Sequence, residues 1–289
     1  MKPSNPDQNP ATVPESTAPK STAPESTALE ARREINLDRR SFLQTATLAA
    51  GATAFLGGAT PQSAFAQVAP AQVAPSANYP LPPKLAEKPL NASILSTEGI
   101  SRRTHEEHFK LYQGYVKKSN ELLEKLATLS RDPAKANQIT SALRDAKVEL
   151  SFALGGVKNH ELYFDILGGA GSEPQGKLLD EINRSFGSVA AWSADLKATG
   201  IAARGWVWTA YDHDFKRLFN YIGDAQNTYP IWNATPIIGL DVYEHAYFLD
   251  FGTKRADYID AFLRNLNWNS VGTRFAQLGE ITGNLVTLA

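Results

Sequence analysis

Two long stretches without internal proline limit the folds that are open to this chain. The first, residues 101–130, contains Gly114 as its single glycine and repeats apolar residues at helical spacing. After Asp132-Pro133, which suits the start of a helix, a second helix is expected from about 134 to 166. Two long helices joined by a short link predict an antiparallel helical hairpin.

The spacing of apolar residues changes after the glycine-rich segment 168–174. Short helices are expected at 176–186 and 188–203, and a helical region is expected at the C-terminus. Three segments rich in β-forming residues lie between them, at 206–211, 217–222 and 237–241. The order predicts an α+β fold, in which a helical hairpin domain (91–168) precedes an α+β metal-binding domain (169–289). The second domain would hold a three-stranded antiparallel sheet with surrounding helices.

The N-terminal 66 residues are expected to form a leader rather than part of the core. Residues 1–37 consist largely of Ser, Thr, Ala, Pro and Glu, a composition typical of disorder. Arg39-Arg40, followed by Ser-Phe-Leu, a mildly apolar stretch and Ala64-Phe65-Ala66, resembles a twin-arginine export signal with its cleavage site. The alternative is an uncleaved tail that anchors the protein. Residues 67–90 are rich in Pro and Ala and predict an extended linker.

The signal implies export to the bacterial periplasm or cell envelope, with the twin-arginine export machinery as a partner. Glycines and threonines interrupt the apolar stretch, so no permanent membrane span is expected. The formal net charge of -1 provides no broad basic surface, which argues against a nucleic-acid partner.

The absence of cysteine requires that any metal be bound through nitrogen and oxygen atoms. The chain has five histidines, which are His105, His108, His160, His213 and His245. Asp241 and His245 are four residues apart, so their side chains would lie close together if the backbone were helical. Imidazole and carboxylate are both suitable ligands for manganese or iron.

The segment 241–251, DVYEHAYFLDF, closely resembles the metal-binding signature of the iron/manganese superoxide dismutases, D-V-W-E-H-A-Y-Y-x-D-Y. The resemblance continues from about residue 90 to the C-terminus through four further motifs in the order of the family. These motifs are Ile100-Ser101 to Val116, Gly156 to Tyr163, Gly205-Trp206-Val207-Trp208, and Arg255 to Trp268. The resemblance implies one manganese ion, or alternatively iron, per subunit.

The ligands that the resemblance implies are His108, His160, Asp241 and His245, with a water or hydroxide as the fifth ligand. His105 lies one helical turn before His108 and is the competing candidate. The resemblance also implies that Tyr115, the gateway residue, relays protons. His108 and Tyr115 are seven residues apart, whereas eight is usual in the family.

The metal preference is suggested by two positions. The iron type usually carries a glutamine four residues before the second ligand, where this chain has Gly156. Gln226 resembles the glutamine that the manganese type supplies from the sheet domain, where it hydrogen-bonds the metal-bound solvent. An apolar shell of Trp206, Trp208, Tyr243 and Phe164 is implied around the metal.

The resemblance further implies a homodimer in which Glu244 reaches a ligand of the partner. The family pairs a histidine and a tyrosine across this interface at positions where the chain has Tyr112 and Phe248, so aromatic packing is expected there. His213, in an expected turn, is interpreted as a solvent-exposed bystander.

The implied function is that of a superoxide dismutase, which converts superoxide to oxygen and hydrogen peroxide. The alternative is a non-catalytic metal-binding or interaction protein of the cell envelope on the same fold.

Overall fold

The computed structural model of the chain describes residues 80–169 and 171–286. The expected leader, the twin-arginine motif, the cleavage site and linker residues 67–79 lie outside the described residues. Residues 80–91 form neither helix nor strand and lead into a short 3-10 helix, η1 (Ala92–Ser96). Within the described part of the chain, no helix has the length and apolar character needed to cross a membrane.

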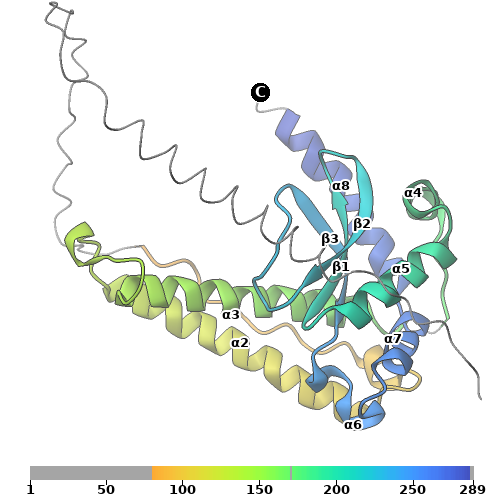
Figure 1. Ribbon diagram of the computed structural model, residues 1–289, viewed down its shortest axis with the longest axis horizontal. Helices are drawn as coiled ribbons and strands as arrows, with labels where there is room; N and C mark the ends of the chain where they lie inside the picture. Colours follow the sequence, from red (N-terminus) through yellow and green to blue (C-terminus); the bar gives the residue numbers. More distant parts are fainter. Residues whose placement is uncertain (1–79, 170, 287–289) are drawn as a thin grey trace, which may run out of the picture. The chain divides into compact units, whose positions relative to one another are not determined.

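The expected helical hairpin is formed by α2 (Arg102–Thr128) and α3 (Ala142–Asp165), which lie side by side and antiparallel (Figure 1). The Ser101 hydroxyl accepts a hydrogen bond from the Thr104 amide and caps α2 at the expected place. The expected start of α3 near residue 134 is wrong, because only a 3-10 turn, η2 (Pro133–Lys135), forms there. The Asn137 carboxamide accepts hydrogen bonds from two following amides, which holds a turn until Ser141 caps α3.

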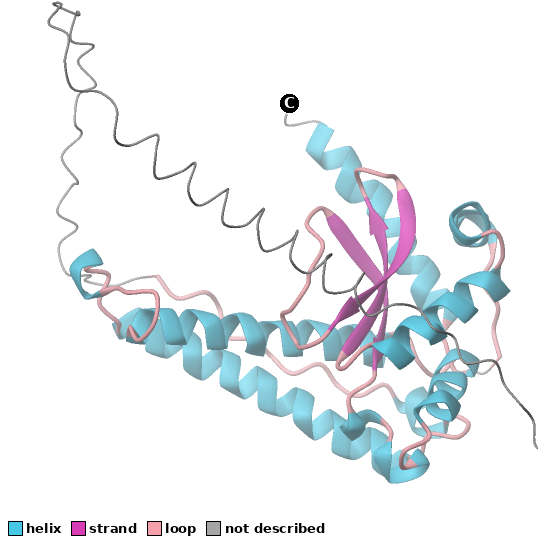
Figure 2. Cartoon of the chain, viewed as in Figure 1, coloured by secondary structure: helices cyan, strands magenta, loops and turns pink. Residues whose placement is uncertain are grey.

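The second domain begins with α4 (Gly176–Phe186) and α5 (Val189–Ala202), close to the expected bounds. Its sheet consists of β1 (Trp206–Asp212), β2 (Arg217–Gly223) and β3 (Ala234–Asp241), in the order β2-β1-β3 with antiparallel neighbours (Figure 2). Strand β3 starts three residues earlier than expected. In the β1–β3 register Trp206 lies opposite Asp241, so the start of the central strand adjoins the end of β3.

The chain closes with η3 (Glu244–Ala246), α6 (Phe248–Phe251), α7 (Arg255–Arg264) and α8 (Trp268–Val286). Helices α3 and α8 pack against β3, while α4 and α5 pack against β2. A single hydrophobic cluster includes Val116 of α2, Phe164 of α3, Trp206 of β1 and Phe262 of α7. The hairpin and the sheet therefore share one core, and the end of β3 faces the hairpin.

An extended segment, residues 84–90, is fastened along the hairpin. Asn120 of α2 exchanges two hydrogen bonds with the backbone of Leu85, and the Tyr112 hydroxyl accepts a hydrogen bond from the Lys88 amide at 2.8 Å. The same hydroxyl donates to Glu161 of α3. Tyr112 is 1% exposed, so the expectation that it packs against a partner subunit is wrong: its side chain is buried within its own chain.

Candidate metal centre

The first candidate ligand, His108, is positioned by α2. It is 1% exposed, and its Nε2 lies 3.1 Å from Asp241 Oδ2. Since α2 is a continuous α-helix, the seven-residue spacing puts Tyr115 two turns further along the same face. The shortened spacing therefore keeps both residues directed toward the same side of the helix.

The second candidate ligand, His160, is positioned by α3. Its Nδ1 donates a hydrogen bond to the Gly156 carbonyl at 2.7 Å, which leaves Nε2 with a free lone pair. That Nε2 is buried and has no hydrogen-bond partner among the described residues. An unpartnered buried acceptor is costly unless something occupies the space in front of it, and a metal ion meets that requirement.

Asp241 and His245 approach each other through a turn. Their spacing of four residues would also have brought them together on an α-helix, but the segment between them is not one. Asp241 ends β3, and its Oδ1 accepts a hydrogen bond from the Tyr243 amide at 2.9 Å. His245 follows in η3, with its Nε2 3.0 Å from Asp241 Oδ2. The turn leaves Oδ2 directed at three histidine rings.

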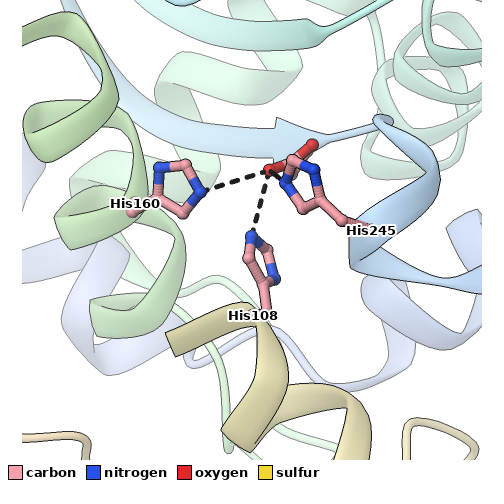
Figure 3. A group of neighbouring side chains, drawn as sticks. His108, His160 and His245 are labelled. Carbon is pink, nitrogen blue, oxygen red and sulfur yellow. Dashed lines mark hydrogen bonds and ion pairs between the residues drawn. The ribbon is translucent and has the colours of Figure 1, made fainter. Parts of the chain in front are cut away.

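The four predicted ligands converge on one point, although they come from two helices, a strand end and a 3-10 turn (Figure 3). One ligand atom from each of His108, His160, Asp241 and His245 lies within 4.8 Å of the others. Three imidazoles and one carboxylate form a hard to borderline donor set that suits manganese or iron. The residues present therefore fit the metal that the sequence predicts.

The protonation states of these groups favour a cation at the centre. Burial lowers the pKa of His108 and lowers that of His160 to about 3, so both rings are neutral at physiological pH. Burial opposes ionisation of Asp241, but His245 and His108 hold its pKa well below the usual range. Burial likewise opposes protonation of His245, but the Asp241 charge raises its pKa overall. The Asp241 carboxylate thus faces two neutral imidazoles and His245, whose proton a bound cation would replace.

Tyr115 and Gln226 meet beside this centre. The Tyr115 ring lies 5.2 Å from that of His160, between centroids, and the Gln226 side chain acts on the pKa of its hydroxyl. Burial raises the pKa of Tyr115, the Asp241 charge raises it further, and Gln226 lowers it in part. The phenol therefore keeps its proton at neutral pH. A Cβ at Gly156 would lie 2.6 Å from the Tyr115 ring, so the glycine leaves the room that this ring occupies.

Aromatic side chains enclose the centre, as predicted. The rings of Trp206, Tyr163 and Phe164 contact the ligand histidines, and Tyr243 is stacked on His245. Trp208, also predicted for this shell, is one step further away. Its indole donates a hydrogen bond to the side chain of Asn159, the residue before His160. This shell excludes water and lowers the local dielectric.

The remaining histidines stay outside the group. His105 is fully buried, and its Nε2 bonds to the Thr97 hydroxyl at 2.7 Å. His213 lies in the β1–β2 turn as expected, but it is half-buried with its Nε2 2.9 Å from the Thr235 hydroxyl, so the interpretation as a solvent-exposed residue is wrong. Glu244, beside His245, is exposed.

Two further residues support the centre that the sequence did not single out for these roles. Asn159 donates from Nδ2 to the Gln226 backbone at 3.1 Å and side chain at 3.3 Å. The buried Tyr258 hydroxyl donates to the Asp241 carbonyl at 2.7 Å. Both residues lie in motifs that carry the resemblance, Asn159 directly before a ligand and Tyr258 in the C-terminal motif, but the motifs alone did not indicate these contacts.

Known proteins resemble this chain over both domains. The family model described as "Iron/manganese superoxide dismutases, alpha-hairpin domain" matches residues 91–168, and the model of the C-terminal domain of the same proteins matches residues 174–274. A protein of Aquifex aeolicus named as an iron superoxide dismutase is 44% identical over 68% of this chain and 92% of its own length. One of Cupriavidus metallidurans, also named as the iron enzyme, is 38% identical over 65% and 95%. A Haloferax volcanii protein named as a manganese superoxide dismutase is 33% identical over 61% and 85%.

Proposed function

The chain belongs to the iron/manganese superoxide dismutase family, and from that premise we propose how its own residues carry out the reaction. Two superoxide ions and two protons give oxygen and hydrogen peroxide. The bound metal supplies the one-electron chemistry of both halves of this reaction. The observation that carries the assignment is the buried cluster of four ligand atoms with an unpartnered His160 Nε2.

We assign the ligands to His108, His160, Asp241 and His245. The neutral imidazoles and the single carboxylate leave a divalent or trivalent ion with net positive charge, which attracts a small anion. Tyr115 holds a proton at the edge of the site, and Gln226 is the side chain that acts on its hydroxyl. These two residues are proposed as the catalytic pair that delivers protons.

The test is a metal analysis of the purified mature protein together with a superoxide-removal assay. Metal with activity, and the loss of both in His160→Ala, is the expected result. Metal without activity would instead support the non-catalytic metal-binding alternative, and absence of both would support the interaction protein.

We propose manganese as the metal of the more active form. Gln226 is 3% exposed and approaches Tyr115 from the sheet domain, the placement associated with the manganese type, while Gly156 leaves no side chain on α3 for that task. The iron names of the Aquifex and Cupriavidus relatives favour the opposite outcome. Stripping the protein and reloading it separately with each metal decides between them, with activity per bound metal as the readout. Higher activity of the iron form overturns the proposal.

We propose a homodimer through the surface that carries Glu244. In the part of the chain that the structure describes, its exposed carboxylate makes no hydrogen bond or ion pair, and the neighbouring Phe248 and Leu249 are about half exposed. Light scattering over a dilution series should give a dimer for the unmodified protein. Glu244→Ala should shift the dissociation to higher concentration, whereas a monomeric unmodified protein with full activity refutes the proposal.

We propose export by the twin-arginine machinery to the periplasm or cell envelope, supported by Arg39-Arg40 and the segment after it. Replacement of both arginines by lysine should retain the enzyme in the cytoplasm. Unchanged export of the double variant would refute this.

A further inference from the structure

Tyr243 lies between two metal ligands in the sequence and differs from the tryptophan of the signature that the chain resembles. Its ring is stacked on the His245 imidazole, with 5.3 Å between centroids and 17° between planes. At this half-buried position the phenol places a hydroxyl, which can both donate and accept, where an indole would place an N–H that only donates. The question is what that hydroxyl does.

The Tyr243 hydroxyl donates a hydrogen bond to the Asp224 carbonyl at 3.3 Å. Gly205 makes this approach possible, since a Cβ there would lie 2.9 Å from Cε2 of Tyr243 and 2.9 Å from the Asp224 oxygen. The Gly205 carbonyl also accepts a hydrogen bond from the Val242 amide at 2.8 Å. Gly205 therefore lies close to both residues of this hydrogen bond, Tyr243 and Asp224, and a larger side chain there would crowd both.

Asp224 is two residues before Gln226, in the turn that follows β2. On the side of α3, Asn159 holds the backbone of Gln226. On the other side, Arg204 binds the Asp224 carboxylate at 2.6 Å. The Tyr243 hydroxyl joins this second side directly to the ligand-bearing segment 241–245.

We infer that Tyr243 is a positioning residue: its hydroxyl ties the ligand segment 241–245 to the turn that carries Gln226. The Tyr243 ring orients His245, and its hydroxyl oxygen holds the turn at residues 224–226. One side chain therefore sets the position of a ligand relative to the side chain of Gln226. The effect on catalysis rests on the proposed role of Gln226. The tie itself does not.

The direct test uses the metal-free full-length protein and amide hydrogen exchange in residues 224–227. Tyr243→Phe keeps the ring and removes the hydroxyl, so exchange there should become about 3- to 10-fold faster, the factor that corresponds to one hydrogen bond. The matched control is Tyr211→Phe, a half-buried tyrosine that lies toward the opposite end of β1 from Trp206. Exchange in 224–227 that is equal in both variants overturns the inference.

A second variant tests the same hydrogen bond in case Tyr243→Phe does not fold. Gly205→Ala keeps the hydroxyl but crowds the approach, and it should accelerate exchange in the same residues. If neither variant changes the exchange of 224–227 while both remain folded by circular dichroism, the tie does not exist.

A double-mutant cycle tests the catalytic consequence. With manganese bound, Tyr243→Phe should lower kcat and shift its pH profile, and the same change in a Gln226→Ala background should have little further effect. Additive effects overturn the coupling. If Gln226→Ala alone changes no rate, the proposed role of Gln226 fails, while hydrogen exchange still judges the tie.

Discussion

Replacement of His108 by alanine should abolish metal retention, whereas replacement of His105 should leave most of it. The two residues are one helical turn apart on α2 and are both buried, so composition and exposure do not separate them. The contacts do. His108 Nε2 faces Asp241 Oδ2 at 3.1 Å, while His105 Nε2 is bonded to the Thr97 hydroxyl at 2.7 Å.

The expected magnitudes differ in kind. Structural zinc in small domains binds with about 10–16 kcal/mol; if the four ligands here share a binding free energy of similar size, the loss of one costs roughly 3–4 kcal/mol, or about 100- to 1,000-fold in affinity. His105→Ala instead loses one hydrogen bond of about 1 kcal/mol and creates a cavity worth roughly 2–3 kcal/mol in the free energy of unfolding. Because the His105 ring bonds to Thr97 and not to a ligand, its metal affinity should change less than about tenfold, the smallest loss typical of residues that support a ligand.

The assay is dialysis of each manganese-loaded variant against a chelator, followed by elemental analysis, with urea unfolding of the metal-free proteins beside it. His213→Ala serves as the control, because the ring of this half-buried histidine bonds to Thr235 in a turn of the sheet domain and contacts none of the four ligands in the described structure. His108→Ala should lose its metal, and His105→Ala should keep its metal but unfold at lower urea. The reverse pattern would show that the first ligand has been misplaced.

Three further outcomes are expected. Burial lowers the pKa of His105 to about 4, below its unfolded value of about 6.5, so this group destabilises the metal-free protein as pH falls from about 6.5 toward 4, by about 1.4 kcal/mol per pH unit. Urea unfolding across this range should therefore show a shallower decline for His105→Ala, and an equal decline contradicts it. Gly156→Ala places a Cβ 2.6 Å from the Tyr115 ring and should cost roughly 1–3 kcal/mol in unfolding free energy and lower the activity per bound metal; unchanged melting and activity refute the packing argument. Tyr258→Phe leaves the buried Asp241 carbonyl without its donor and should cost about 1–3 kcal/mol, measured by thermal unfolding, with Tyr211→Phe as the neutral comparison.

The sequence patterns were most informative where a local rule decides the structure. The bounds of α2 follow from the Ser101 cap and an uninterrupted apolar stripe, and the sheet follows from the β-forming residues of its first two strands. The start of α3 was misplaced, because the Asn137 turn competes with the helix through side-chain hydrogen bonds that composition does not reveal.

The candidate site was predictable from spaced motifs, but its supporting contacts were not. Tyr112 shows why: the resemblance implied an interface position, whereas its ring packs on Phe109 and Phe164 and its hydroxyl bonds to the Lys88 amide. Likewise, Asp241 and His245 meet through a turn whose shape depends on the hydrogen bond that the Tyr243 amide donates to the Asp241 carboxylate. Such contacts join segments far apart in the sequence, so they depend on tertiary packing rather than on local pattern.

The burial of the ligands has a consequence for how the enzyme acquires its metal. His108, His160 and Asp241 are at most 1% exposed and come from segments of both domains. We therefore expect an ion to reach these three ligands mainly when the protein opens locally, so that the rate of opening limits exchange. The ion bound to a folded molecule is therefore expected to be one that was available where the chain folded. A change of medium after folding alters the surroundings of the enzyme long before it alters its metal.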